Sequence, residues 1–490
     1  MFDRLVKYFG NENVGLLHSD AFGRILLGMG EKGETDDALV HYDTAKNLSF
    51  PLTVATADQV FTSALKFLGF EKIYATLSYS KIIVDEIQAY SPATVAIIIQ
   101  ALQEVQKLGG KYLVLTATLP PIIKSHLECD FYIEHIPNLE KHRVELVSAE
   151  INSQVIRFVG KFWGKKILIV CNTVRKAQEV YRILKDRYSR FRGYDIESCC
   201  VKRNPLILFH GCFTSWDKRE KERIVLDQKF LGILVATQVV EVSLDIDFDV
   251  LLTELAPLEV LIQRMGRIYR RYKEDGKYAL QEPNVYVFTE NPSGKGTVYE
   301  SEIVSKTLSF LKDGILSERN KLEMVDQFYS EANLRDTRYL ALFRNALDFL
   351  NKSYGENSKD KAQEIFRGMD SVNVLPSSFL ESPIQNPSLL QHLCLQQGIS
   401  LKSALIGINY GNRAQRMLGY ELIKDFLVPI RTWTLQKTES KSLSDLVKND
   451  LFRGILVVDG RYDEEGFKID ARDCKNSTFS EGETFGDGII

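Results

Sequence analysis

The sequence predicts an α/β protein of more than one domain, built on doubly wound parallel sheets. Short apolar runs rich in valine and isoleucine alternate with longer amphipathic stretches, as in buried parallel strands joined by helices. Polar residues directly follow several of these runs, at the sheet edge where open α/β proteins bind ligands. The chain has 490 residues, which is too long for one hydrophobic core, so about two to four domains are expected.

The bulk composition is that of an ordinary globular protein. Hydrophobic residues make up 44% and charged residues 26% of the chain, and the net charge is −3. A nucleic acid would therefore have to bind a local basic groove, because the overall field is weak. The seven cysteines have no C-x-x-C spacing, which predicts a reduced compartment and no metal framework. No apolar run approaches the ~18 residues of a membrane span, so we expect a cytoplasmic protein with no membrane partner.

The stretch 232–270 contains the densest set of candidate functional residues. An apolar strand (232–237) leads into a polar loop, and a second strand (250–255) leads into a helix that ends in a cluster of arginines. These arginines are spaced three apart and project to one side, where three forked cations suit a polyphosphate. A solvated basic helix end is the alternative. The candidates in this stretch are Thr237, Gln238, Asp245, Gln263, Arg264, Arg267 and Arg270.

Two strands in the first half of the chain also end in candidate residues. One run (81–85) ends in the acids Asp85 and Glu86, and the next (112–115) is followed by Thr116 and, two residues on, a second threonine. Mg²⁺ prefers oxygen ligands and keeps much of its water, so one carboxylate near the ion and a second to orient water are sufficient. Adjacent acids are commonly only solvated, but their position directly after an apolar strand favours a site.

Further strand ends supply candidates for contact with nucleic acid. The polymer would lie across both sheets, held through its phosphates and by stacking on side chains. For each candidate the alternative is a structural cap at the end of a strand. The candidates are Thr56, Gln59, His210, Thr237 and Gln238.

The motifs, taken in order, resemble those of superfamily-2 helicases. The matching segments are D-E-x-Q at 85–88, T-A-T at 116–118 and Q-R-x-G-R-x-x-R at 263–270. Two further segments, F-H-G-x-F-T at 209–214 and A-T-Q-V-V-E-V-S-L-D-I-D at 236–247, look more specifically like the type I CRISPR-associated helicase-nuclease family. The resemblance covers essentially the whole chain. It implies two tandem RecA-like doubly wound parallel sheets, the first of them incomplete, with a helical linker and a small α+β accessory domain.

The resemblance implies a division of the chain into four parts. One further strand, at 131–136, is expected before the second sheet, and the polar composition of 475–490 favours disorder. The four parts are a partial first RecA-like domain (1–145), a second RecA-like domain (146–292), the helical linker (293–368) and the accessory domain (369–490).

The resemblance also implies ATP and Mg²⁺ as cofactors and gives each candidate a role. Asp85 and Glu86 would bind the metal and serve catalysis, and Arg267 and Arg270 would be arginine fingers that reach across the cleft between the two sheets. Gln263 would lie near the γ-phosphate of ATP. The remaining nucleotide-binding candidates are Asp245, which would lie near the ribose, and Gln88, Thr116, Thr118 and Arg264.

The implied function is ATP-dependent translocation on single-stranded DNA and unwinding of target DNA for degradation in CRISPR interference. A guide-RNA surveillance complex would load the DNA, and a fused or separate HD nuclease would degrade it. Two departures from the family pattern matter: the sequence has no G-x-x-x-x-G-K-[ST] phosphate loop and no His-Asp dipeptide. We therefore expect a carboxyl-terminal segment that needs a missing amino-terminal polypeptide for turnover and has no nuclease activity of its own.

Two other functions are compatible with the same motifs. A superfamily-2 RNA helicase shares the core motifs, and RNA would then stimulate its ATP hydrolysis more than DNA does. A non-catalytic module would bind nucleic acid or the surveillance complex, and ATP would not change that binding.

Overall fold

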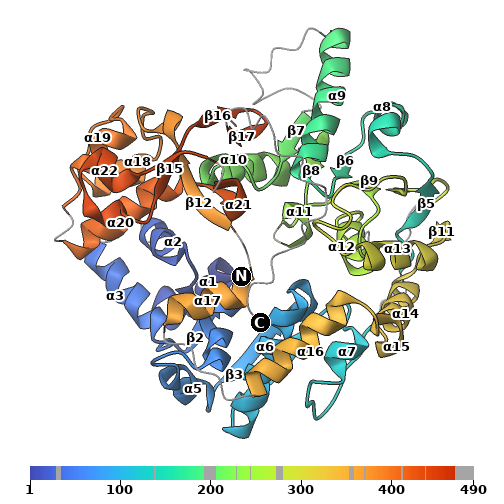
Figure 1. The fold of residues 1–490 in the computed structure, drawn as a ribbon, viewed down its shortest axis with the longest axis horizontal. Helices are drawn as coiled ribbons and strands as arrows, with labels where there is room; N and C mark the ends of the chain where they lie inside the picture. The colour runs from blue at the N-terminus through green and yellow to red at the C-terminus, as the bar shows by residue number, and fades with distance from the viewer. Residues whose placement is uncertain are drawn as a thin grey trace.

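The chain folds into three groups of elements around the middle of the molecule, with the amino terminus close to that middle (Figure 1). The blue elements of the first half, the green and yellow elements of the second half and the orange and red elements of the carboxyl-terminal part form the three groups. This computed structural model describes residues 1–28, 35–136, 139–192, 206–227, 229–242, 244–271, 280–351, 358–368, 371–409, 412–435 and 438–469. The predicted polar tail at 475–490 lies outside these ranges.

A seven-stranded sheet forms the centre of the second half. The strand order is β11-β5-β10-β9-β6-β8-β7, and every neighbouring pair is parallel except β11 with β5. Every side chain of β6, β8, β9 and β10 is buried. The strands are β5 (Arg143–Val147), β6 (Ile167–Val170), β7 (Leu206–Phe209), β8 (Ile233–Ala236), β9 (Val250–Glu254), β10 (Val285–Phe288) and β11 (Gly314–Ile315). The sheet confirms the predicted doubly wound α/β fold.

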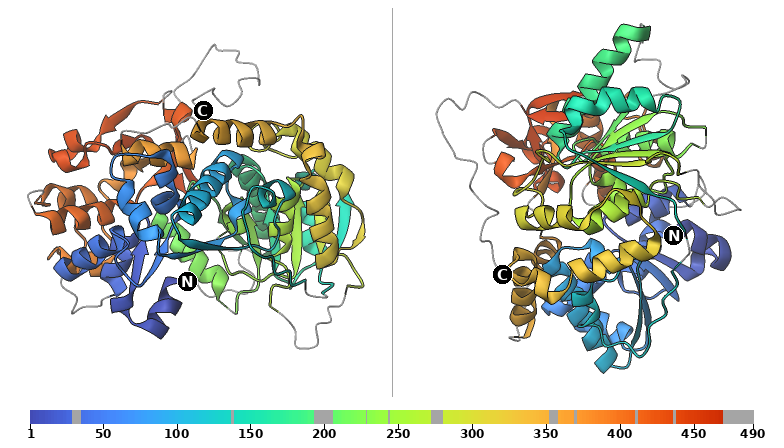
Figure 2. Two further views of the ribbon diagram at one scale, coloured as in Figure 1. Left: turned by 90° about the horizontal axis from the view of Figure 1, so that it is seen from below. Right: turned by 90° about the vertical axis from the view of Figure 1, so that its right-hand side faces the viewer.

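Helices cover both faces of this sheet. Side chains of α8 and α9 pack on one face, in a core with Ile167 and Ile169 of β6. Side chains of α12 and α13 pack on the other, in a core with Leu168 and Val170. Figure 2 shows the sheet between these two layers in its right-hand view. The helices are α8 (Ile151–Lys161), α9 (Val174–Arg192), α10 (Ser215–Leu226), α11 (Val239–Val242), α12 (Leu258–Met265), α13 (Ser301–Phe310), α14 (Glu318–Phe328) and α15 (Glu331–Leu334).

The first half contains two separate pairs of parallel strands. Strand β1 pairs with β2, and β3 pairs with β4, and within the described ranges no strand joins the two pairs. The strands are β1 (Val14–Leu17), β2 (Leu52–Ala55), β3 (Lys81–Asp85) and β4 (Lys111–Leu115). The helices are α1 (Phe2–Phe9), α2 (Ala21–Gly28), α3 (Thr35–Lys46), α4 (Ala57–Val60), α5 (Glu71–Leu77), α6 (Pro92–Lys107) and α7 (Pro121–Lys124).

The prediction of a strand at 131–136 is wrong. These residues follow α7 without helix or strand structure, and the side chains of Phe131, Tyr132 and Ile133 are exposed. Their composition suits a strand, but a strand needs a neighbour to bond with. The segment pairs with no described strand, so no strand accepts its backbone hydrogen bonds.

Two later helices return to the first half of the chain. Helix α16 (Arg338–Asn351) packs along α6, and α17 (Lys359–Arg367) follows it (Figure 1). The Thr94 hydroxyl in α6 donates to the Phe366 carbonyl in α17 at 2.8 Å. The predicted helical linker therefore contributes directly to the packing of the first half.

The carboxyl-terminal part packs against the amino-terminal elements. Buried side chains of α1, β1 and α2 share one core with those of α19, α20 and α22. The four-stranded sheet of this part has the order β13-β12-β15-β14, and a hairpin, β16–β17, follows it. The strands are β12 (Ser371–Pro376), β13 (Val428–Arg431), β14 (Ser440–Ser442), β15 (Leu456–Val458), β16 (Gly460–Asp463) and β17 (Gly466–Ile469), and the helices are α18 (Pro387–His392), α19 (Leu401–Ile406), α20 (Arg413–Lys424), α21 (Thr432–Leu435) and α22 (Leu443–Val447). The predicted domain limits stay a prediction.

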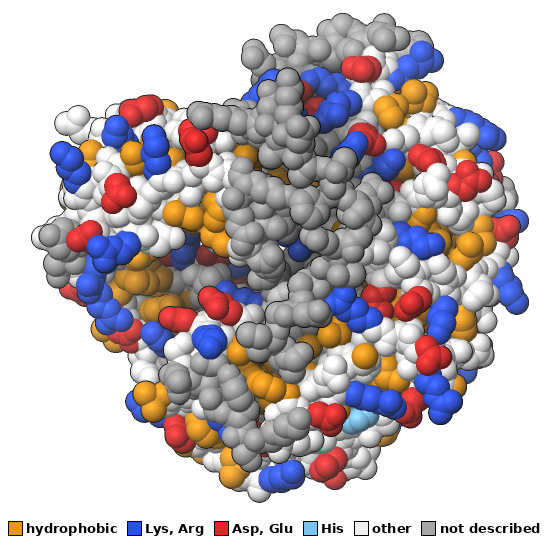
Figure 3. Space-filling view, viewed as in Figure 1, with side chains coloured by type: hydrophobic (Ala, Val, Ile, Leu, Met, Phe, Trp, Pro, Cys, Tyr) orange, Lys and Arg blue, Asp and Glu red, His pale blue; other side chains and the backbone are white. Residues whose placement is uncertain are grey.

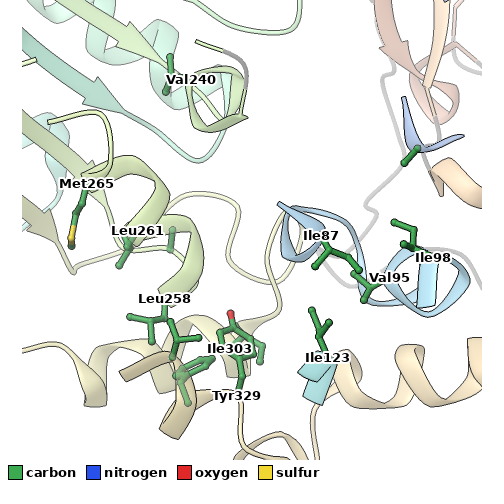
Figure 4. Close-up of a cluster of buried hydrophobic side chains, with 14 of the residues drawn as sticks. Ile87, Val95, Ile98, Ile123, Val240, Leu258, Leu261, Met265, Ile303 and Tyr329 are labelled. Carbon is green, nitrogen blue, oxygen red and sulfur yellow. The ribbon is translucent and has the colours of Figure 1, made fainter. Parts of the chain in front are cut away.

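The largest apolar core joins the first and second halves. It includes Val95 and Ile98 of α6 together with Leu258 and Leu261 of α12 (Figure 4). Tyr329, which directly follows α14, lies in the same core. The two halves therefore share one continuous apolar core, whose burial stabilises their contact.

The surface carries charges of both signs. Figure 3 shows lysine and arginine side chains interspersed with aspartate and glutamate over the visible face, in line with the small net charge of −3. Among the residues with described structure, no helix is long and apolar enough to span a membrane.

Candidate functional site

The carboxyl ends of β3 and β4 bring two predicted motifs together. Glu86 follows β3 in a left-handed conformation (φ 52°), and its backbone N–H donates to the Leu115 carbonyl at 2.9 Å. Gln88 donates to the Glu86 carboxylate. The Thr116 hydroxyl lies 2.7 Å from Gln88 Oε1 and 3.4 Å from Glu86 Oε2. These contacts fix the orientation of Glu86 at the edge of the sheet.

The two acids provide carboxylates that fit a hydrated Mg²⁺. Asp85 is the last residue of β3 and is exposed, whereas Glu86 is half-buried. The described part of the chain holds no group of three or more metal-ligating side chains. Mg²⁺ in nucleotide sites takes only one or two carboxylates from the protein, and phosphate and water complete its shell. An exposed carboxylate beside a fixed one therefore suits this ion.

Thr118 lies on the inner side of the same network. Its side chain is buried, its backbone N–H donates to Thr116 Oγ1 at 3.1 Å, and its carbonyl lies 2.6 Å from that oxygen. This placement favours a structural role in the loop over the predicted nucleotide contact.

The turn after α12 holds Arg267 against the backbone of the preceding loop. Its Nη1 donates to the Leu244 carbonyl at 2.8 Å, and its Nη2 donates to the Glu241 carbonyl. Its Nε is buried without a hydrogen-bond partner. The pKa of Arg267 is lowered to about 10, mainly by burial and also by the charge of Arg270, while Asp245 and Glu86 act in the opposite direction. The charge of Glu86 therefore acts on Arg267 across the two halves.

The backbone of this arginine turn is fixed at several points. Phe248 N–H donates to the Arg267 carbonyl at 2.9 Å, and Tyr269 N–H donates to the Phe248 carbonyl at 3.0 Å. Tyr269 has a positive φ of 49°, which few residues with a side chain adopt. His142 donates from Nε2 to the Ile268 carbonyl at 3.2 Å. These bonds position the arginines before any ligand binds.

Arg270 is accessible and pairs with a second predicted site residue. Its Nε lies 2.9 Å from Asp245 Oδ1, and the two side chains are 42% and 65% exposed. Its backbone N–H donates to Asp247 Oδ1 at 2.8 Å. The predicted ribose contact of Asp245 and the predicted finger Arg270 therefore lie in one ion pair at the surface. Gln263 is half-buried in the last turn of α12, one turn before Arg267.

Arg264 does not fit its predicted role as a nucleotide ligand. The side chain is fully buried, and its Nε lies 2.9 Å from Glu241 Oε1. Its Nη1 donates to the Thr253 hydroxyl at 2.8 Å, and its Nη2 donates to the Tyr299 hydroxyl at 3.2 Å. Groups of the protein itself bond this guanidinium. The spacing of three residues between Arg264, Arg267 and Arg270 therefore does not place Arg264 on the accessible side.

Thr56 and Gln59 lie at an accessible strand end in the first half. Thr56 is exposed and directly follows β2, and Gln59 is half-buried. Asp58 between them forms an ion pair with Arg367 of α17. Burial opposes the charge of Asp58, but bonds from Thr56 and Arg367 outweigh it and lower the pKa of this carboxyl below its usual value. This ion pair connects the loop of Asp58 to α17, the helix that returns from the second half.

His210 does not fit the predicted contact with nucleic acid. The ring is fully buried and stacks on Phe213, with 4.4 Å between ring centroids. The turn of the β16–β17 hairpin covers it: a Cβ built on Gly466 would lie 2.9 Å from the ring of His210. Burial lowers the pKa of His210 to about 3. This residue is part of the contact between the second sheet and the carboxyl-terminal hairpin.

The other two predicted nucleic-acid residues of the second half also have protein partners. Thr237 is buried at the end of β8. Gln238 is half-buried, and its Nε2 donates to the Asn172 carbonyl at 2.7 Å. Neither side chain lies free at the surface. Gln59 is likewise half-buried and donates to Asp58 Oδ2 at 3.1 Å, so Thr56 is the exposed candidate of the five.

Several residues with structural roles in and near the site were not among the candidates predicted from the sequence. Glu241 pairs with Arg264 and supports Arg267 through its carbonyl, and its place inside the motif at 236–247 was an available signal. Glu465 in the hairpin turn receives two bonds of 2.7 Å from Arg182 of α9. Nothing in the local sequence of Glu465 or Arg367 indicates these partners, because they lie hundreds of positions apart along the chain.

The comparison with family models identifies one match. Residues 163–273 match the model described as CRISPR-associated nuclease/helicase Cas3, C-terminal. This range covers strands β6 to β9, helix α12 and the arginine turn.

Curated relatives match a larger part of the chain. A CRISPR-associated nuclease/helicase Cas3 of Methanothermobacter thermautotrophicus is 28% identical over 401 residues, which are 76% of this chain and 46% of that protein. A putative CRISPR-associated nuclease/helicase Cas3 of Methanocaldococcus jannaschii is 26% identical over 420 residues, covering 79% and 54%. The CRISPR-associated endonuclease/helicase Cas3 of Escherichia coli is 26% identical over 361 residues, covering 65% and 37%. The chain thus spans about half the length of the first two relatives.

Solved structures show the same fold. A crystal structure of T. fusca Cas3 with ATP matches with a TM-score of 0.69 at 19% identity, over 96% of this chain and 62% of that one. A chain in a structure of a CRISPR RNA-guided surveillance complex, pre-nicking, matches with a TM-score of 0.64 at 18% identity, over 95% and 63%. The resemblance seen in the motifs is therefore confirmed: this chain is a relative of the CRISPR-associated nuclease/helicase Cas3 proteins, and its residues 163–273 correspond to their carboxyl-terminal family model.

Proposed function

We propose that this chain is the motor part of an ATP-dependent helicase of CRISPR interference that translocates on single-stranded DNA. The main support for the proposal is the electrostatic interaction between the acidic motif of the first half and the arginine turn of the second half. Glu86, fixed by Gln88 and Thr116, faces the turn of Arg267 closely enough for its charge to act on that guanidinium. Acids on one sheet and arginines on the other are the arrangement that phosphoryl transfer requires.

In this proposal the first half supplies the metal and water positions. Asp85, exposed at the end of β3, would hold Mg²⁺. Glu86 is half-buried, and bonds from Gln88 and Thr116 fix its carboxylate, so it can orient a water molecule. ATP with Mg²⁺ supplies the phosphoryl group and neutralises the charge that develops on it.

The second half supplies positive charge. Arg267 now bonds two backbone carbonyls, and Arg270 pairs with Asp245 at the surface. A bound polyphosphate would compete for both guanidinium groups, because a charged acceptor forms stronger bonds than a carbonyl or an exposed carboxylate. Exchange of these partners would couple nucleotide binding to the loop at 241–247.

The DNA would run past the accessible strand ends of the first half. Exposed Thr56 can contact phosphates there, and contacts with phosphates position a polymer without reading its bases. One structural relative lies in a complex named as an RNA-guided surveillance complex. We propose the same kind of partner for this chain, together with an HD nuclease on another polypeptide or on a part outside these 490 residues.

The 490 residues contain no G-x-x-x-x-G-K-[ST] segment, so in this proposal turnover depends on a phosphate-binding loop supplied from elsewhere. The test is ATP hydrolysis by the purified chain with and without single-stranded DNA, with Asp85→Ala/Glu86→Ala as the control for contaminating ATPase. We expect no DNA-stimulated turnover above that control. Turnover that the double substitution abolishes would contradict the dependence on a supplied loop.

Two outcomes of the same assay separate the alternatives. A completed protein that RNA stimulates more strongly than DNA would be a superfamily-2 RNA helicase. A chain that binds DNA or the surveillance complex equally well with and without ATP, and shows no turnover when completed, would be a binding module.

A further inference from the structure

Helix α17 holds the loop that follows β2. Arg367 Nε donates to Asp58 Oδ2 at 3.2 Å, and its Nη2 donates to the same oxygen. Gln363, one turn earlier in α17, donates from Nε2 to the Asp58 carbonyl at 3.4 Å. Two side chains of one helix thus bond the side chain and the backbone of a single residue. We call Arg367, Gln363 and Asp58 the α17 clamp.

The loop depends on such contacts because it has little structure of its own. Thr56 precedes α4, which is a single turn of four residues, and its side chain does not cap that helix. A helix of one turn is not stable by itself. The Asp58 carboxylate in this turn also accepts from Gln59 Nε2 at 3.1 Å and from the Thr56 side chain. Asp58 therefore joins Arg367 to both neighbouring polar side chains.

The residues of the loop and the clamp differ in exposure. The Asp58 side chain is 12% exposed, whereas that of Arg367 is 43% exposed and Thr56 lies at the surface. A carboxylate repels phosphate, so Asp58 cannot itself attract a nucleic acid. The role that remains for this acid beside a polyanion is to orient the polar groups around it.

Helix α17 is also bonded to α6, the helix that follows the acidic motif along the chain. The Thr94 hydroxyl of α6 donates to the Phe366 carbonyl at 2.8 Å, which satisfies one of the last carbonyls of α17. The pKa of Tyr90, just before α6, is raised mainly by burial and also by the charges of Asp58 and Asp85. The loop after β2 and the acidic motif after β3 therefore act on the same phenol, and α17 contacts the segments of both.

We propose that Arg367 is a positioning residue that fixes Asp58, so that Asp58 holds Thr56 in place to contact single-stranded nucleic acid. Arg367 acts through Asp58 and does not itself bind the polymer. The contact of Thr56 with nucleic acid rests on the proposed function, whereas the fixing of the loop by the α17 clamp does not.

A direct contact between Arg367 and phosphate is the competing role, and the two roles differ in the sign of one effect. Asp58→Asn removes a negative charge, so on charge alone it should strengthen the binding of a polyanion. Under the positioning role it weakens binding, because the ion pair that fixes the loop is lost. Salt separates the roles as well, since each phosphate contact on a single strand contributes about 0.7 to the slope of log affinity against log salt.

The test is the binding of a fluorescently labelled oligothymidylate to the full 490-residue chain, measured by anisotropy without nucleotide. We expect Arg367→Ala and Asp58→Asn each to weaken binding by about three- to tenfold, the equivalent of one hydrogen bond. The double variant should bind no more weakly than either single variant, because both substitutions remove the same interaction. The salt slope of Arg367→Ala should equal that of the unaltered chain.

Hydrogen exchange reports on the loop without any ligand. Thr56 N–H donates to the Leu17 carbonyl at 3.1 Å, and Gln59 N–H donates to the Thr56 carbonyl at 3.0 Å. Exchange of these two amides should become faster in both single variants. The matched control is Arg344→Ala in α16, where the arginine is 55% exposed and pairs with Glu331. This control should change neither binding nor exchange, and thermal unfolding shows that each variant remains folded.

Unchanged exchange of the loop in Arg367→Ala would overturn the proposal. Stronger binding by Asp58→Asn, additive losses in the double variant or a reduced salt slope in Arg367→Ala would also overturn it and assign Arg367 a direct contact with phosphate. Faster loop exchange in both variants of a chain that binds no single-stranded DNA would contradict the DNA contact of the proposed function and support the fixing of the loop by the α17 clamp.

Discussion

Strands β6 and β3 have similar apolar cores but opposite surroundings. β6 lies within seven strands, and every one of its side chains is buried. β3 has only β4 beside it, and three of its five side chains are exposed. The comparison shows that the neighbours of a strand, and not its own composition, decide how much of its apolar surface is buried.

The candidate site lies between these two environments. The open first half contributes Asp85 and Glu86, and the closed second half contributes Arg267 and Arg270. A closed sheet holds its residues rigidly, whereas an open one depends on further elements for support. The comparison can therefore be tested by substitutions placed in matched positions of the two halves.

The largest expected effect is on turnover. If Arg270 acts as the proposed arginine finger, Arg270→Ala in a protein completed with a phosphate-binding unit should lower ATP hydrolysis by about 10³-fold or more. The free energy of unfolding should change by less than about 1 kcal/mol, because the pair with Asp245 is exposed. Steady-state ATPase and urea unfolding measure the two effects. Arg175→Ala on α9, also a largely exposed arginine, is the control, and equal turnover in both variants would remove Arg270 from the site.

The next effect compares two ion pairs. Arg264→Leu leaves Glu241 buried without its cation and should cost about 3–5 kcal/mol of stability. Arg367→Leu breaks the pair with Asp58, in which the arginine is 43% exposed, and should cost about 1 kcal/mol or less. Urea unfolding of both variants measures the difference. The double variant Arg264→Leu/Glu241→Leu should recover much of the loss, and similar costs for the two single variants would contradict the contrast between the halves.

A third comparison uses one isoleucine in each sheet. Ile169→Ala in β6 removes a fully buried side chain and should cost about 2–5 kcal/mol. Ile83→Ala in β3 removes a largely exposed side chain and should cost less than about 1 kcal/mol. Chemical unfolding followed by far-UV circular dichroism gives both values. A large cost at Ile83 would mean that something covers the β3 face in solution.

The smallest effect concerns the edge of the closed sheet. The folded-state pKa of His210, about 3, lies below the unfolded value of about 6.5, so its contribution to stability is complete above pH 6.5 and is lost as the pH falls towards 3. Between pH 6.5 and 5 the loss should be about 2 kcal/mol. His210→Phe keeps the stacking on Phe213 and should reduce the pH dependence of unfolding by this amount. Unchanged pH dependence in urea unfolding would show that the ring is accessible to protons.

The sequence predicted the parts of the fold that depend on local composition. The apolar runs of β3, β4, β8 and β9 became strands, and Asp85, Glu86 and Thr116 lie at the strand ends where they were expected. The strand at 131–136 did not form, because its composition is suitable but no described neighbour accepts its hydrogen bonds. Local sequence contains no information on that neighbour.

For the site residues too, local sequence predicted the position in a strand or helix but not the exposure of the side chain. Spacing alone placed Arg264 beside Arg267 and Arg270, yet Arg264 points into the protein and pairs with Glu241. His210 ends a predicted strand, yet the hairpin turn with Glu465 and Gly466 covers it. Both outcomes depend on elements far away in the chain.

The sequence by itself determined several of the strands, the motif residues and the resemblance to the helicase-nuclease family. These follow from the periodicity of side chains and the chemistry of short segments, which are local properties. Only the tertiary structure decided which of these side chains stay accessible and which face of β3 and β4 stays bare. Burial and partner choice are set by contacts between distant segments, and a single position in a sequence does not specify them.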